Sequence, residues 1–342
     1  MIRSAIYLIL SIPLLFLASC NESAKSSYDM LPGASGRIGE VIVVMPDSQW
    51  NGIAGQAIRD AFYASYDLLP QHEPCFDLKH QDPPTYGRFF REHRNVLMVL
   101  IEDHIDSQVA STNEILNKHS KNQRIVEVRA KNTSDFLEEF QSKSGLILEK
   151  FHDAEIARAT NMNAGKVNPL AHEILDAKFG IEMDIPTSFT EIVGDSAFSW
   201  FKKNWDERNP ELEKAIVVYS YPYVSDSAFS IYSIIENRDR ILGEYIHGSR
   251  ATTDMITEHF YEPLLDTIDV GGRFTARVKG LWKIKGAFLG GPFVSYSFLD
   301  ASTYNVVTVE GYIFAPHEDK RDHMRSVEAI VRSARPTILE KE

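Results

Sequence analysis

The apolar positions of the chain follow two patterns, which predict two differently built halves. Continuous β-branched runs in the first half predict strands buried on both faces of a sheet, at Glu40–Pro46, Asn95–Ile101 and Arg124–Ala130. Helical spacing of apolar residues predicts a helix within "WNGIAGQAIRDAFYASY", with Ser48 or Asn51 as its cap, and further helices at Ser107–Lys118 and Ser134–Thr160. The segment after the first of these predicted helices, "LLPQHEPCFDLKHQDPP", contains four prolines, which exclude a regular helix there. Alternating strands and helices predict an open α/β layer.

The pattern changes at Asn161–Pro169, which we interpret as the boundary between the halves. Short segments with apolar alternation follow, and each predicts strand structure: "FGIEMDIP", "FTEIVGDSAFSWFKK", "KAIVVYSYPY", "FVSYSFLD" and "NVVTVEGYIFAP". We also expect a helix capped at Ser225 or Asp226, a second helical region before Arg273, and a closing helix at Asp319–Ser333. Strands dominate, so the second half is predicted to be an α+β domain with an antiparallel sheet.

One segment of this half, Arg273–Lys285, alternates with strict period two, so one face should pack on a core and the other should meet water. On a chain with a net charge of −12, its polar face reverses the local sign and predicts binding of an anionic glycan, a lipid head group or an acidic protein. The alternative is a solvated sheet face, or an edge strand whose lysines discourage pairing. Five cations share the odd positions: Arg273, Arg277, Lys279, Lys283 and Lys285.

An apolar run, Ala5–Leu17, precedes both halves and follows the single charge of Arg3. It is shorter than the roughly 20 residues of a membrane-spanning helix, and it is typical of the core of a secretory signal. The run ends on Leu17-Ala18-Ser19-Cys20, which resembles the lipobox of bacterial lipoproteins. That resemblance implies that the Cys20 sulfur carries a diacylglyceryl group with palmitate-type chains. The alternative is an ordinary signal peptide that ends on a cysteine by accident.

These patterns divide the chain into a lipoprotein signal peptide at residues 1–19, a flexible tether at 20–37, an α/β domain at 38–165 and an α+β domain at 170–338. Acyl chains on Cys20 would hold the protein at a membrane without crossing it. Acylation also leaves Cys75 as the only thiol, which is typical of a small buried hydrophobe. The acidic net charge argues against nucleic acid as a partner.

Candidate chemistry is sparse and each candidate has a structural alternative. His72, Cys75 and His80 could ligate a metal, but their spacing matches no standard site, and loop packing is the alternative. A second group follows the predicted strand at Asn95–Ile101, where α/β sheets place ligand sites, and could supply a general base or bind a cation. Its alternative is a polar loop with a helix cap. That group consists of Glu102, Asp103, His104 and Asp106.

Standard catalytic motifs are missing from the sequence. It holds no phosphate-binding loop, no Gly-x-Ser-x-Gly elbow and no His-Glu-x-x-His zinc helix, so no cofactor or metal is implied. Three Asp-Ser/Thr-apolar triplets, at Asp195, Asp226 and Asp266, resemble O-glycosylation acceptors of Bacteroidota envelopes. Capping explains Asp226 equally well.

Two resemblances extend this interpretation. The chain resembles an uncharacterised family of Bacteroidota envelope lipoproteins, classed as a domain of unknown function. The resemblance lies in the lipobox, in "LLPQHEPCFDL" and "RNVLMVLIED", and in the tail from "GGPFVSYSFLD" to "VEGYIFAPHEDKRDHMRSVEAIVRSAR". In such lipoproteins surface export implies a dense acidic cluster after the cysteine. Only Glu22 is acidic there, so we expect an outer-membrane anchor that faces the periplasm. The order of "FGIEMDIPTSFT", "VTVEGYIFAP" and "MRSVEAIVRSA" is similar to the PsbP-like fold, whose members are mostly non-enzymatic accessory proteins.

The sequence therefore leaves two functional hypotheses. The first is a non-catalytic envelope lipoprotein that acts as an accessory or binding protein, with an envelope protein or an anionic glycan as partner. The second is an envelope hydrolase that acts on glycan or lipid, with His104 at its centre. A deep pocket that gathers His104 with carboxylates from separate elements would favour the hydrolase.

Overall fold

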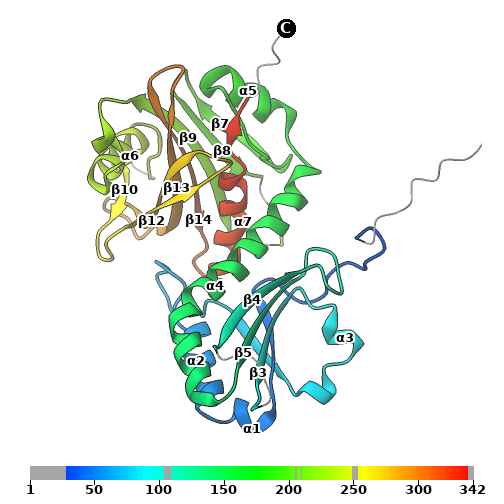
Figure 1. Ribbon diagram of the computed structural model, residues 1–342. Coiled ribbons are helices and arrows are strands. Elements are labelled where there is room, and N and C mark those ends of the chain that lie inside the picture. The colour runs from blue at the N-terminus through cyan, green and yellow to red at the C-terminus, as the bar shows by residue number, and fades with distance from the viewer. Residues whose placement is uncertain (1–27, 104–108, 205, 209, 249–252, 338–342) are drawn as a thin grey trace, which may run out of the picture.

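Two β-sheets, one in each half of the chain, organise the fold (Figure 1). The computed structural model describes residues 28–103, 109–204, 206–208, 210–248 and 253–337. The first half is an α/β layer and the second is an α+β half with an antiparallel sheet, as predicted. Helix α4 (Thr133–Ala164) runs from the first sheet to the second and joins them. None of the described helices is both long and apolar enough to cross a membrane.

The first sheet places its β-branched strands at its centre, in the order β2-β1-β3-β5-β4. Strands β1 (Glu40–Val44), β3 (Asn95–Ile101) and β5 (Arg124–Ala130) lie where the apolar runs predict them, and they pair in parallel. Strand β2 (Asp77–Gln81) adds to the other side of β1, also in parallel. Parallel strands need cover on both faces, which explains why these runs are apolar without alternation.

Helices bury the two faces of this sheet unequally. On one face α2 (Ile53–Phe62) and α4 pack against the strands, with Phe62 and Phe151 fully buried between them. Helix α1 (Asp47–Trp50) precedes α2 at the carboxyl edge of the sheet. A smaller cluster covers the opposite face, where Tyr86 lies between the short helices η1 (Pro83–Thr85) and α3 (Arg88–Arg91).

The helix predicted at Ser107–Lys118 is wrong over its described part. Residues Ser111–Leu116 form strand β4, which pairs antiparallel with β5. Ser, Thr and Asn favour helices weakly, and a short isolated helix is marginal, whereas β5 offers a complete row of backbone partners. The proline-rich stretch likewise contains β2, which the sequence did not predict. Its prolines fall before and after the strand and leave the ladder intact.

Residues 28–37, predicted to belong to a flexible tether, lie against the first domain instead. The backbones of Gly33 and Ser35 bridge those of Lys121 and His93 in parallel. The Tyr28 hydroxyl donates a hydrogen bond of 3.2 Å to Asn122. Only the part of the tether that precedes residue 28 lies outside the described residues. The chain therefore enters the body along the amino ends of β3 and β5.

The second sheet is antiparallel and has eight strands in the described part of the chain. Its main path follows the order β10-β12-β13-β14-β9-β8-β7, and β11 pairs beside β10 along β12. The strands are β7 (Phe189–Gly194), β8 (Phe198–Lys203), β9 (Glu213–Pro222), β10 (Met255–Glu258), β11 (Leu264–Asp269), β12 (Phe274–Ile284), β13 (Gly290–Asp300) and β14 (Asn305–Phe314).

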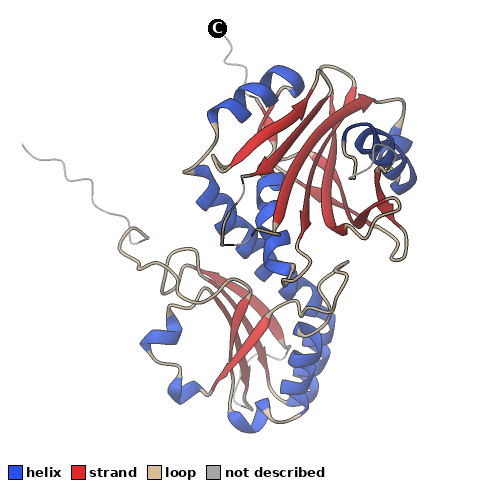
Figure 2. Ribbon diagram, turned by 180° about the vertical axis from the view of Figure 1, so that it is seen from behind, coloured by secondary structure: helices blue, strands red, loops and turns tan. Residues whose placement is uncertain are grey.

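Helices cover both faces of the second sheet (Figure 2). Helix α6 (Ile231–Tyr245) packs on one face. Helices α5 (Pro169–Phe179) and α7 (Arg321–Arg332) pack on the other. Each strand thus contributes alternate residues to two separate cores. The closing helix predicted at Asp319–Ser333 is α7.

Three expectations for this half need correction. Of "FGIEMDIP" only β6 (Ile181–Glu182) is a strand, paired with β15 (Arg335–Pro336). Strands β10 and β11 occupy the described part of the region expected to be helical before Arg273, because β12 offers them its free edge. The cap of α6 is Ser230, whose hydroxyl accepts from the Ser233 N–H, whereas Asp226 begins the short helix η2 (Asp226–Phe229).

Helix α7 is the element that both halves share. Its apolar residues, such as Val327 and Val331, pack on the second sheet. Its other side lies against α4 and the segment that precedes β2, as the red helix beside green α4 in Figure 1 shows. Arg321, Arg325 and Glu328 are consequently buried although they are charged. A helix buried on both sides must have every charge paired, since an unpaired buried charge is costly.

Glu73, in the segment before β2, caps α7 from the opposite half. Its two carboxylate oxygens accept the N–H groups of Lys320 and Arg321 at 2.7 and 2.8 Å. The residue at the helix N-cap, Lys320, makes no side-chain cap of its own. A carboxylate at a helix amino end satisfies free N–H groups and complements the helix dipole. The cap therefore joins the halves.

We predict that Glu73→Gln lowers the free energy of unfolding by about 1–2 kcal/mol, because the amide loses the charge that faces the helix amino end. Urea denaturation followed by circular dichroism measures the change. Glu173→Gln, at an exposed position of α5, is the matched control and should leave stability within about 0.5 kcal/mol. Equal stability of the two variants would contradict the cap.

Candidate functional site

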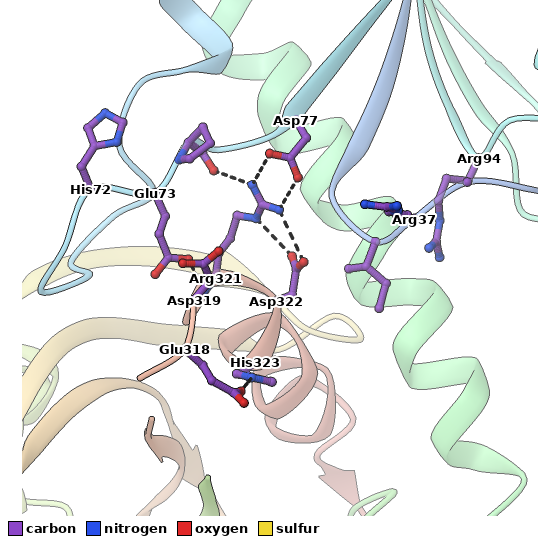
Figure 3. A pocket seen from close by; sticks show the side chains of 13 residues that line it. Arg37, His72, Glu73, Asp77, Arg94, Glu318, Asp319, Arg321, Asp322 and His323 are labelled. Carbon is purple, nitrogen blue, oxygen red and sulfur yellow. Dashed lines mark hydrogen bonds and ion pairs between the residues drawn. The ribbon is translucent and has the colours of Figure 1, made fainter. Parts of the chain in front are cut away.

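Two hollows lie side by side where α7 meets the first half. The larger encloses about 870 Å³ and is drawn in Figure 3. The smaller encloses about 450 Å³. Segment 64–77 of the first half contributes to both, with Pro74 and Asp77 on the larger and Cys75 and Phe76 on the smaller. Ligand sites occur preferentially at such domain junctions, which makes these hollows the candidate site.

Arg321 is the hub of the larger hollow. Its guanidinium donates to the Pro74 carbonyl at 2.8 Å and to Asp77 at 2.9 Å, and it also binds Asp322, as Figure 3 shows. Burial acts to lower the pKa of Arg321, but the hydrogen bonds that it donates to Asp77 and Asp322 raise the pKa above its ordinary value. The cation is thus held permanently charged within a balanced set of carboxylates.

His323 and Glu318 also line the larger hollow, and the His323 Nε2 lies 2.7 Å from a Glu318 carboxylate oxygen. Burial lowers the pKa of His323, so the imidazole is neutral at neutral pH. Arg37, on the segment that enters the body, also lines this hollow, and its side chain has no partner among the described residues. This hollow is therefore charged throughout, with acids and bases mixed and mostly paired.

The smaller hollow has a different composition, with an apolar wall and cations on the opposite side. Tyr66, Phe76 and Leu148 supply the apolar wall from the first half. Arg277 and Lys279 of β12 and Arg325 of α7 line it from the second half. The Arg325 guanidinium carbon lies 4.5 Å from the Phe76 ring centroid, a stacking distance for a cation on an aromatic face. The hollow thus offers both apolar contact and positive charge.

A buried carboxylate, Glu328, lies behind these cations. It accepts a hydrogen bond of 3.0 Å from the Tyr296 hydroxyl, and it lies 3.2 Å from His152 and 3.7 Å from Arg277. Burial acts to raise the pKa of Glu328, but His152, Lys279 and Arg277 lower it well below its ordinary value. The ionised carboxylate fixes the position of the cations that reach the hollow.

The structure divides the five cations predicted on the odd face of β12. Arg277 and Lys279 line the smaller hollow, so this face is largely covered and does not meet water as expected. Arg273 packs 3.5 Å from the Phe298 ring centroid and donates to the Ala334 carbonyl. Lys283 pairs with Glu258 at 3.1 Å. Lys285 is exposed on the turn after β12. A single five-cation surface is not formed.

The other candidates lie apart from the hollows or from one another. His80 stacks on Trp50 at 4.8 Å and does not join His72, which lines the larger hollow, or Cys75, which lines the smaller. No three His, Cys, Asp or Glu side chains of the described residues form a metal-binding group.

The polar group predicted after the strand at Asn95–Ile101 is only partly visible. Glu102 and Asp103 are exposed at the carboxyl edge of the first sheet, and neither lines the two hollows. His104 and Asp106 lie outside the described residues. The hydroxyl residues of the three Asp-Ser/Thr-apolar triplets, Ser196, Ser227 and Thr267, are exposed, and their glycosylation stays a prediction.

Sequence reasoning missed the residues of the first half that build the site. Glu73 and Tyr66 lie in segments without a regular pattern, so nothing in the sequence links them to α7. A signal was present within α7 itself, where Arg325 and Glu328 recur at helical spacing among apolar residues. Charged residues on the apolar stripe of a helix indicate a buried polar interface.

Comparisons with known proteins find family models for both halves. Residues 34–164 match "Domain of unknown function (DUF8532)", and residues 168–333 match "Domain of unknown function (DUF4837)". No curated protein matches the chain in sequence.

Solved structures give weak likenesses to the chain. The Saccharomyces cerevisiae Ran-binding protein Mog1p is 12% identical, with a TM-score of 0.32 over 46% of this chain and 90% of its own. LpqN of Mycobacterium tuberculosis, described as involved in cell envelope biogenesis, is 11% identical, with a TM-score of 0.27 over 45% of this chain and 81% of its own. Likenesses at this level support no inference about function.

We predict that the free energy of unfolding falls as the pH is lowered, because Glu328 becomes protonated. Its lowered pKa means that the ionised form stabilises the fold at neutral pH, and that this contribution is lost as the pH falls below the ordinary carboxyl value of 4.5. Glu328→Gln should therefore be less stable than the wild type by about 3 kcal/mol near neutrality, and the difference should shrink in acid. Urea midpoints across pH measure this difference. A gap that is constant with pH would contradict the assignment.

Proposed function

We propose that this chain, whose two halves match two families of domains of unknown function, is a lipid-anchored binding protein of the bacterial cell envelope. It acts without catalysis of its own, as an accessory protein. The observation that carries the proposal is Leu17-Ala18-Ser19-Cys20, which places a cysteine directly at the end of a short apolar run. The anchor is expected in the outer membrane, with the body in the periplasm.

The path of the chain into the body supports an anchor that presents the larger hollow to a nearby surface. Cys20 lies eight residues before Tyr28, the first described residue. At no more than about 3.6 Å per residue, these residues reach roughly 30 Å. Gly36, Arg37 and Ile38, which follow, line the larger hollow. A tether of this length keeps that hollow close to the membrane that holds the acyl chains.

The character of the hollows supports a binding role. Most of their charged groups hold one another in pairs, such as Arg321 with Asp77, and the pairing joins the two halves. Groups that are fixed in this way provide a rigid recognition surface. The partner is expected to be an envelope protein or an anionic glycan.

The alternative is an envelope hydrolase with its site near His104. That site would lie at the carboxyl edge of the first sheet, opposite the edge where Arg94 and Asp77 line the larger hollow. Glu102 and Asp103 are exposed there, so water is not excluded from them. Turnover of envelope glycans or lipids that is abolished by His104→Ala would establish the hydrolase instead.

The anchor is tested by Cys20→Ser. In a bacterial host with lipoprotein processing, wild-type protein should be recovered in the membrane pellet, and the mass of its amino-terminal peptide should show Cys20 with acyl chains. The serine variant should lose those chains, because the hydroxyl cannot replace the thiolate in the transfer. Cys75→Ser is the matched control and should remain acylated. An unacylated wild-type Cys20 would overturn the proposed anchor.

A further inference from the structure

From the charges around the smaller hollow we infer that it binds a small organic carboxylate with an apolar body, an inference that rests on the binding role proposed above and adds a small-molecule ligand to its partner. The hollow of about 450 Å³ lies within the usual size range of small-molecule sites. It is formed by both halves, with the apolar wall on one side and the cations on the other. A molecule with one anionic end and one apolar end matches that division.

Buried positive charge exceeds buried negative charge around the hollow. The side chains of Arg277, Lys279 and Arg325 are only 12%, 18% and 2% exposed. The acids that line the same hollow face water instead, since Asp67 and Asp266 are 57% and 52% exposed and Glu149 is exposed as well. Glu328, at 2% exposed, is the buried carboxylate close to these cations. Each of these cations has an acidic partner, Asp266, Asp67 or Asp322, but those carboxylates are accessible to water and offset the burial only in part, so an added anion is favoured.

Two of these cations also have hydrogen-bonding capacity to spare. The Lys279 ammonium donates no hydrogen bond among the described residues, and its ion-pair partner Asp67 is 3.6 Å away. The Nε of Arg325 is buried without an acceptor among the described residues, although its other two nitrogens donate to Asp322 and to the Cys75 carbonyl. Buried donors are nearly always satisfied in folded proteins, so an acceptor for the Arg325 Nε is expected in the hollow that Lys279 also lines. A carboxylate offers two acceptor oxygens.

The surroundings select a carboxylate with one charge over a more highly charged anion. Asp67, Asp266 and Glu149 form an acidic rim, which repels phosphate or a polyanionic glycan more strongly than a monoanion. Phe76 and Leu148 give no polar partner to a second anionic group on the opposite wall, and together with the Tyr66 ring they can bury an aliphatic or aromatic body. The apolar wall thus also disfavours a small inorganic anion.

Cys75 provides a direct measure of occupancy, because it lines the hollow. In the full-length Cys20→Ser chain it is the only thiol, since the sequence has 2 cysteines. The chain is handled without detergent, so that no detergent molecule enters the hollow. Its alkylation by N-ethylmaleimide is followed by intact mass while one probe is added: phenylpropanoate, its neutral amide, or inorganic phosphate.

We expect phenylpropanoate to slow alkylation of Cys75 in a saturable way, and we expect the amide and phosphate to have little effect. Lys279→Gln should weaken this protection about tenfold, because it removes a charged hydrogen bond. Lys279→Arg keeps the cation and should retain protection. Lys202→Gln, which removes a paired lysine of the same sheet away from the hollow, is the control and should behave like the wild type.

Three results would overturn the inference: no protection of wild-type Cys75, equal protection by the amide, or undiminished protection in a Lys279→Gln variant whose urea midpoint matches the wild type. If Lys279→Gln does not fold, the comparison of carboxylate with amide in the Lys279→Arg variant decides the question. None of these results bears on the acylation of Cys20, which is measured separately. Failure of the ligand assignment is therefore distinguishable from failure of the anchor.

Discussion

The two halves are held together by α7, whose amino end is capped by a carboxylate from the other half. Glu73 satisfies N–H groups that α7 leaves free, and no local side chain replaces it. Arg325 reinforces the contact by donating to the Cys75 carbonyl at 2.7 Å. Farther along, Arg332 pairs with Asp153 of α4. Because α7 also packs on the second sheet, its burial depends on both halves at once.

This dependence explains the character of the candidate site. Buried charges are tolerated only where partners are placed accurately, and here the partners come from different halves. Glu328 on α7 faces His152 on α4 and Arg277 on β12. Both hollows exist only in the docked arrangement, since each takes part of its wall from each half. A ligand or partner that binds there would also stabilise the docked state.

The sequence predicted the central strands well because their physical basis is local. Long β-branched runs such as Asn95–Ile101 are suited to a buried parallel strand wherever they occur. Edge elements were missed, because Ser111–Leu116 becomes a strand only when β5 supplies its partners. The site was predicted in part: the alternation of β12 identified Lys279, but not the elements that cover it. Glu73 and Tyr66 could not be found, since their roles depend on contacts with α7 and β12 that are distant in sequence.

Hydrogen exchange of the full chain at increasing urea, followed by mass spectrometry, tests the shared helix most directly. If α7 depends on both halves, peptides from β3 and β5, from β13 and β14, and from α7 should converge on one opening free energy. The account would be contradicted if the first-half strands opened at much lower urea while α7 stayed fully protected, because α7 would then be stable on the second sheet alone.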